Sequence, residues 1–145
     1  MDQRGYVLAV QHYPCTAVAV SLARAIATRA YAPFPWIDHD VVKLLVSETA
    51  TNAVLHAGDG GFDLICHAPL GGAIQIELHD RSETRPVRLP YSAWEEHGRG
   101  LELLDLLAPG WSVVRTMNGK GLVFALEANL DDDGPLHSRS TTQVW

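Results

Sequence analysis

The segment from Val41 to Ala57, VVKLLVSETATNAVLHA, carries a carboxylate and a carboxamide one helical turn apart. At about 100° per residue, Glu48 and Asn52 fall on one stripe of a helix. The apolar members of that stripe are Val41, Leu44, Leu45 and Leu55. Because an ionised carboxylate is costly to bury alone, we expect the stripe to border a polar cavity that holds a cation or a phosphate. The alternative, a helix rotated so that both residues face water, fits the periodicity equally well.

Within such a cavity the two side chains would have different tasks. Asn52 would offer its carbonyl oxygen to Mg²⁺, a hard ion that also keeps water and phosphate oxygens as ligands. Glu48 would act as a general base or orient an attacking hydroxyl group.

A second carboxylate, Asp80, ends the strictly alternating segment AIQIELHD and precedes a long stretch without a regular pattern. A carboxylate that faces a cavity from the end of a strand can accept hydrogen bonds from an adenine amino group. A turn residue that merely ends a strand has the same sequence pattern, so both interpretations stay open here.

Two glycine-flanked cations complete the set of candidate residues. In His97-Gly98-Arg99-Gly100-Leu101, the glycines permit backbone N–H groups to approach phosphates, and Arg99 adds a positive charge. The helix predicted directly after this segment adds its dipole. In the segment Gly119-Lys120-Gly121 a hairpin turn explains the glycines, and a phosphate contact from Lys120 is the second interpretation. For the first segment, too, a simple turn is the structural alternative.

The elements that would position these residues follow from hydrophobic periodicity and from the prolines and glycines. Strands are predicted at 6–13, 62–68, 73–80, 111–117 and 122–128. Helices are predicted from Thr16 to before Pro33 with Pro14 in the first turn, at 39–57 behind an Asp38 N-cap, and at 101–108. This order predicts an α+β fold, a two-layer sandwich with helices on one face of a mostly antiparallel sheet.

The chain length is typical of one domain, which we expect at 1–130, followed by a disordered polar tail at 131–145. The net charge of −6, without a cluster of Lys and Arg, argues against direct nucleic-acid binding. No run of about 18 apolar residues and no signal-like N-terminus is present, so we expect a cytoplasmic protein without membrane segments. Cys15 and Cys66 are expected to be reduced thiols, and the histidines lack zinc-binding spacing.

In their order and spacing, these segments resemble the ATP-binding domain shared by histidine kinases, gyrase, Hsp90 and MutL, the GHKL superfamily with the Bergerat fold. The chain looks most like the short anti-sigma-factor serine/threonine kinases. SETATNAVLHA is similar to the N box of the family, which implies that Asn52 holds Mg²⁺ and that Glu48 assists phosphoryl transfer from ATP. IELHD resembles the strand before the first glycine box, so Asp80 would bind adenine.

Two further segments extend the resemblance over nearly the whole chain before the tail. HGRGLELLDLLA is similar to the second glycine box, which implies that Gly98 and Gly100 lie near the phosphates, with Arg99 and Leu101 beside them. WSVVRTMNGKGLVFAL resembles the closing strands of the family around a Gly-Lys turn. The resemblance implies that the partners are a sigma factor and an anti-sigma-factor antagonist, and it leaves a homodimer open.

One departure from the family pattern bears on activity. The first glycine box of the family reads Asp-x-Gly-x-Gly, whereas this chain has Asp80-Arg81-Ser82-Glu83-Thr84. Side chains in place of both glycines would restrict the turn beside the adenine and weaken nucleotide affinity. Three hypotheses therefore remain: an ATP-dependent kinase that phosphorylates the antagonist and sequesters the sigma factor, a non-catalytic partner-switching module, and a generic interaction domain. Whether residues 81–97 close over a nucleotide as a lid stays open.

Overall fold

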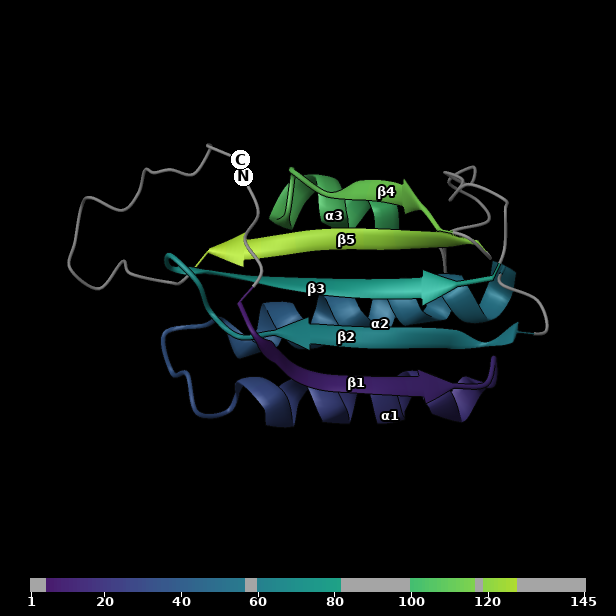
Figure 1. Cartoon of the computed structure of the whole chain (residues 1–145), viewed down its shortest axis with the longest axis horizontal. Helices are drawn as coiled ribbons and strands as arrows, with labels where there is room; N and C mark the ends of the chain where they lie inside the picture. The colour runs from purple at the N-terminus through teal and green to yellow at the C-terminus, as the bar shows by residue number, and fades with distance from the viewer. Residues whose placement is uncertain (1–4, 57–59, 82–99, 117–118, 128–145) are drawn as a thin grey trace.

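The computed structural model of the chain describes residues 5–56, 60–81, 100–116 and 119–127. Within these ranges, the strands form an antiparallel sheet in the order β1-β2-β3-β5-β4. The strands are β1 (Val7–Tyr13), β2 (Phe62–His67), β3 (Ala73–Asp80), β4 (Ser112–Arg115) and β5 (Lys120–Glu127). The helices α1 (Ala17–Tyr31), α2 (His39–His56) and α3 (Gly100–Leu107) all lie on one face of the sheet (Figure 1). The predicted α+β two-layer sandwich is confirmed.

The first helix, α1, follows from an Ala-rich segment without Gly or Pro, which favours helix throughout. It begins at Ala17 after an extended Thr16, so the prediction that Pro14 lies in its first turn is wrong. At the other end, the imidazole of His39 donates hydrogen bonds from Nε2 to the carbonyl oxygens of Tyr31 and Phe34, at 3.0 and 3.1 Å. Both carbonyl oxygens also accept a backbone N–H group, so His39 adds a second hydrogen bond to each and ties the start of α2 to the connection after α1.

The core lies between the sheet and the helix layer. The inner positions of α1 include Ala19, Ala23 and Ala27, each at most 1% exposed. Because these side chains are small, α1 and α2 pack closely together. The largest fully buried side chains come from both layers: Tyr31, Phe62, Phe124, Leu45, Leu64, Ile74, Ile76 and Leu104. Dense packing of this kind fixes the helices against the sheet and therefore the polar residues that they carry.

The second helix, α2, begins at the predicted residue because Asp38 caps it. The Asp38 carboxylate accepts hydrogen bonds from the backbone N–H groups of Asp40 and Val41, at 3.1 and 3.2 Å.

Replacing Asp38 by alanine is expected to lower the free energy of unfolding by about 1 kcal/mol, because these N–H groups lose their acceptor. Urea denaturation checks this, with Asp38→Asn, which keeps an acceptor oxygen, as the control. Equal losses in both variants would contradict the assignment of the cap.

The orientation of α2 differs from the sequence prediction. Of the predicted buried apolar stripe, only Leu45 is fully buried, whereas Leu44 and Leu55 are 39% and 49% exposed. The buried face instead consists of Val42, Leu45, Val46, Thr49, Ala50 and Ala53. Apolar residues surround this helix on most sides, so periodicity alone does not select one face, and packing against α1 decides. Glu48 and Asn52 consequently lie at half-buried positions beside the core rather than in its middle.

The turns between strands are close to the predicted positions. The β2–β3 connection contains Gly71 and Gly72 at φ values of 64° and 84°, a conformation that favours glycine. The turn of the last hairpin lies two residues earlier in the chain than predicted, because β4 ends at Arg115 and β5 already begins at Lys120. The predicted loop at 81–97, apart from Arg81, and the predicted tail at 131–145 lie outside the described residues.

Candidate functional site

Asp80 is the last residue of β3, and the alternation of that strand sets the direction of its side chain. Ile74, Ile76 and Leu78 belong to the core beneath the helices. Side chains two residues apart lie on the same face of a strand, so Asp80 lies on the helix side of the sheet as well. Its side chain is only 8% exposed. The sequence-predicted base acceptor is therefore a buried carboxylate on the face that α2 covers.

Lys120 is the residue that the structure brings to Asp80. The two residues are paired in the register of β3 and β5, and their side chains lie on the same face. The Nζ atom of Lys120 donates to both carboxylate oxygens of Asp80, at 3.1 and 3.0 Å, and the Lys120 side chain is 11% exposed. Lys120, predicted to lie in a turn, is instead the first residue of β5 and binds the residue predicted to receive the base, while its predicted contact with a phosphate stays a prediction.

The predicted catalytic base, Glu48, and the predicted magnesium ligand, Asn52, lie on α2, which packs against α1, α3 and β3. Both Glu48 and Asn52 are half-buried. None of the hydrogen bonds in the described part of the chain engages the Asn52 carboxamide, whereas nearby hydroxyl groups on the helix bond back to carbonyl oxygens. An amide oxygen is a hard ligand that suits Mg²⁺, so the chemistry of the Asn52 side chain fits the ion that the sequence implies.

The glycine-rich segment before α3 is described only in part. His97, Gly98 and Arg99 lie outside the described residues. Gly100 is the first residue of α3, and Leu101 follows in its first turn, so the predicted helix directly after the glycines is present. Among the described residues, no group of three or more His, Cys, Asp or Glu side chains is arranged to hold a metal ion.

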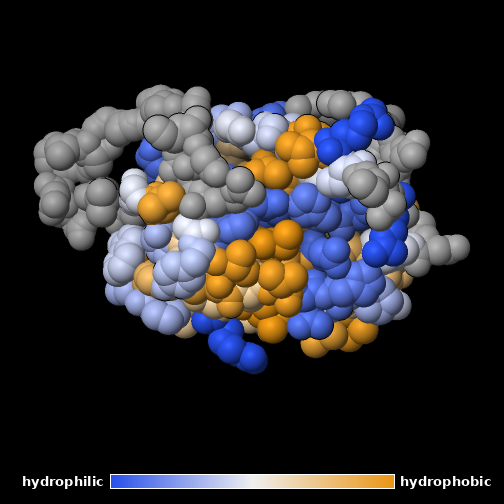
Figure 2. Space-filling model, viewed as in Figure 1, coloured by the Kyte–Doolittle hydropathy of each residue, from blue (hydrophilic) through white to orange (hydrophobic). Residues whose placement is uncertain are grey.

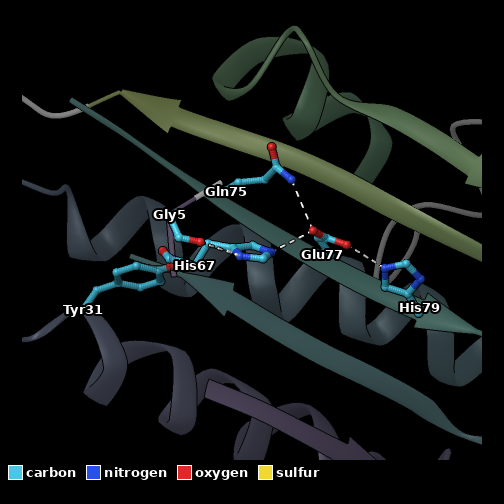
Figure 3. A network of polar contacts seen from close by, with 6 residues as sticks. All are labelled: Gly5, Tyr31, His67, Gln75, Glu77 and His79. Carbon is cyan, nitrogen blue, oxygen red and sulfur yellow. Dashed lines mark hydrogen bonds and ion pairs between the residues drawn. The ribbon is translucent and has the colours of Figure 1, made fainter. Parts of the chain in front are cut away.

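The opposite face of the sheet carries a polar network that the sequence analysis did not identify (Figure 3). Glu77 accepts hydrogen bonds from Nε2 of His67 and Nε2 of His79, both at 2.7 Å, and a weaker one from Gln75 at 3.2 Å. Hydrogen bonds from His79, and then those from His67 and Gln75, hold the pKa of Glu77 at about 2, below its usual 4.5, although burial opposes this shift.

This network also joins the sheet to the helix layer. The Tyr31 hydroxyl donates to the carbonyl oxygen of His67 at 2.8 Å, and burial raises the pKa of that hydroxyl. The network belongs to the hydrophilic band that follows β3 on the uncovered face, beside an apolar surface over β1 and β2 (Figure 2). Alternation in AIQIELHD places Gln75, Glu77 and His79 on one face, which is the signal in the sequence. The contribution of His67 depends on strand register, which that signal does not contain.

Comparisons with known proteins find a solved structure with a similar fold but assign the chain to no family. No protein-family model matches the sequence, and no curated protein matches it. The chain is similar to the solved structure of the RsbU and RsbW domains of Rv1364c from Mycobacterium tuberculosis, with a TM-score of 0.61 and 18% sequence identity. The match covers 83% of this chain and 32% of that chain. None of the helices in the described ranges is long and apolar enough to cross a membrane.

Proposed function

We propose that this chain is a nucleotide-dependent partner-switching regulator, a protein kinase that binds ATP with Mg²⁺ and phosphorylates a serine or threonine of an anti-sigma-factor antagonist. In its other state it sequesters a sigma factor and releases it when the antagonist binds. The observation that carries the proposal is the buried Asp80 carboxylate, which lies at the end of β3 on the face covered by α2. The similarity to a structure with an RsbW domain supports it at the level of fold.

The residues of the chain would share the work of binding and phosphoryl transfer. Asp80 would accept a hydrogen bond from the amino group of adenine, and this contact would select adenine over other bases. Asn52 would hold Mg²⁺ through its carbonyl oxygen, and the ion when bound would neutralise charge on the phosphates. Glu48 would accept the proton of the attacking hydroxyl group while the new bond to the γ-phosphorus forms and the bond to the β-phosphate oxygen breaks. Transfer of this kind depends chiefly on positioning, which the packed α2 provides.

Partner exchange then follows from the phosphorylation state of the antagonist. A phosphate group in a protein interface disrupts it by repulsion and by the cost of desolvation. A phosphorylated antagonist would therefore leave this chain free to hold the sigma factor, and an unphosphorylated one would displace it. The net charge of −6 is compatible with regulation through protein partners rather than direct contact with DNA.

A second candidate function is a partner-switching module that binds nucleotide weakly or not at all. The observation that favours it is the ion pair between Lys120 and Asp80, which engages both oxygens of the base acceptor. The sequence also favours this second candidate, because it has Ser82 and Thr84 in place of the two glycines of the family pattern. This module would exchange protein partners without phosphoryl transfer.

Thermal unfolding with ATP and with GTP, each with Mg²⁺, separates the two candidates. A ligand at 100 times its dissociation constant stabilises the folded state by about 2.7 kcal/mol, which for this size corresponds to a rise in Tm of roughly 5–10 °C. We expect such a rise with ATP and a smaller one with GTP, because guanine presents a carbonyl oxygen where adenine presents its amino group. Equal shifts would contradict base recognition by Asp80, and no shift at millimolar nucleotide would favour the non-catalytic module.

A further inference from the structure

The contact between Lys120 and Asp80 is built into the closing hairpin. Asp80 and Lys120 form the last pair of the ladder between β3 and β5. A glycine stands on each side of Lys120, and both lie close to β3, Gly119 against its backbone and Gly121 against a side chain. A Cβ atom at Gly119 would collide with the carbonyl oxygen of Asp80, and one at Gly121 would collide with the imidazole of His79. These glycines bring the start of β5 against the end of β3 and carry the Lys120 ammonium to the Asp80 carboxylate.

The burial of this ion pair sets it apart from an ordinary surface contact. The side chains of Asp80 and Lys120 are 8% and 11% exposed, whereas those of Asp63 and His12 in a neighbouring pair are 42% and 52% exposed. Exposed pairs contribute little to stability because water and salt screen them. A buried carboxylate that loses a cationic partner is costly, so we expect the Lys120 ammonium to stay on Asp80 unless another donor replaces it.

We propose that Lys120 regulates the nucleotide site by occupying its base acceptor, so that adenine binds only after the ammonium has left Asp80. This inference rests on the proposed function and adds to it an intramolecular competitor. The competitor is part of the chain, so the apparent nucleotide affinity equals the intrinsic affinity multiplied by the fraction of molecules in which the ion pair is open. The chain therefore binds adenine weakly until a change at the hairpin, such as contact with a protein partner, draws Lys120 away.

The proposal and the phosphate-contact interpretation predict opposite effects for Lys120→Met. If Lys120 covers the base acceptor, its removal strengthens binding, and the effect is present with adenosine, which has a base and no phosphates. If Lys120 contacts a phosphate, its removal weakens ATP binding and leaves adenosine unchanged. The experiment is therefore a calorimetric titration of the full chain and its variants with adenosine and, separately, with ATP and Mg²⁺.

We expect Lys120→Met to bind adenosine at least about tenfold more tightly than the original chain. Arg115→Met is the matched control, because Arg115 pairs with Lys120 in the register of β4 and β5 but is exposed. It removes the same charge from the same end of the sheet without touching the ion pair. Lys120→Arg, which keeps a cation on Asp80, is expected to bind adenosine no better than the original chain and remains informative if the methionine variant is unstable.

The outcomes separate this inference from the proposed function. Tighter adenosine binding by Lys120→Met alone supports the competitor. ATP binding by the original chain with unchanged adenosine affinity in Lys120→Met overturns the inference and leaves the proposed function standing. Tighter adenosine binding by Lys120→Arg also overturns it. Failure of both the original chain and a folded Lys120→Met to bind ATP or adenosine at millimolar concentration overturns both proposals, since Asp80 would then bind no base even in the absence of the Lys120 ammonium.

Discussion

Replacing Glu77 by glutamine is expected to lower the free energy of unfolding at pH 7 by on the order of 3 kcal/mol. The carboxylate accepts from His67, His79 and Gln75, and its side chain is only 10% exposed. A glutamine of the same shape turns an amide N–H group toward one of these donors, which leaves buried polar groups without partners. The loss should therefore be well above that of a surface substitution.

The same residue predicts how stability depends on pH. The pKa of Glu77 is about 2 in the folded chain, against a usual 4.5. A carboxyl group with a lowered pKa contributes stability that is fully present above 4.5 and is lost as the pH falls from 4.5 toward 2. The difference between the original chain and Glu77→Gln should therefore be constant near neutral pH and shrink across this acidic range.

Urea unfolding at a series of pH values between 7 and 3 measures both effects. Glu127→Gln is the matched control, because Glu127 is exposed and ends β5. That variant should follow the original chain at every pH. Curves for Glu77→Gln and the original chain that stay parallel down to pH 3 would show that the network does not hold the Glu77 charge.

The arrangement of elements is the part of the structure that the sequence predicts well. Prolines and glycines mark the ends of most elements, as at Pro33 and at Gly71–Gly72, and the alternation of AIQIELHD gives β3 its observed bounds. The Asp38 cap likewise follows from residue type and position, because its carboxylate binds the first free N–H groups of α2. These signals are local in the chain, so a single sequence contains them.

The features that the sequence does not predict depend on contacts between distant segments. The rotation of α2 is decided by the alanines of α1, because leucines and valines on several sides of α2 offer more than one face for burial. The ion pair of Asp80 requires that β5 start at Lys120 and pair with the end of β3. The network around Glu77 needs the register that brings His67 of β2 beside β3. Periodicity carries no information about register between strands.

The candidate site, too, combines residues that the sequence predicts with contacts that only the structure shows. From the sequence, Glu48, Asn52 and Asp80 are predicted to bind a ligand or to take part in catalysis. The structure places Asp80 on the face of the sheet that α2 covers. Gly98 and Arg99 stay predictions, since they lie outside the described residues. The position of Lys120 differs from the prediction, because it lies at the start of a strand and binds Asp80 rather than standing in a turn, whereas its contact with a phosphate stays a prediction.

Calorimetric titration with ATP, in the presence and absence of Mg²⁺, tests the nucleotide-binding function most directly. We expect binding that depends on Mg²⁺ and that Asn52→Ala weakens at least about tenfold, because the variant removes the carbonyl oxygen that would hold the ion. Thr51→Ala is the matched control, since the Thr51 hydroxyl bonds back to the carbonyl oxygen of Ser47 within α2. Equal ATP affinity of Asn52→Ala and the original chain, or no binding at millimolar ATP, would contradict the account.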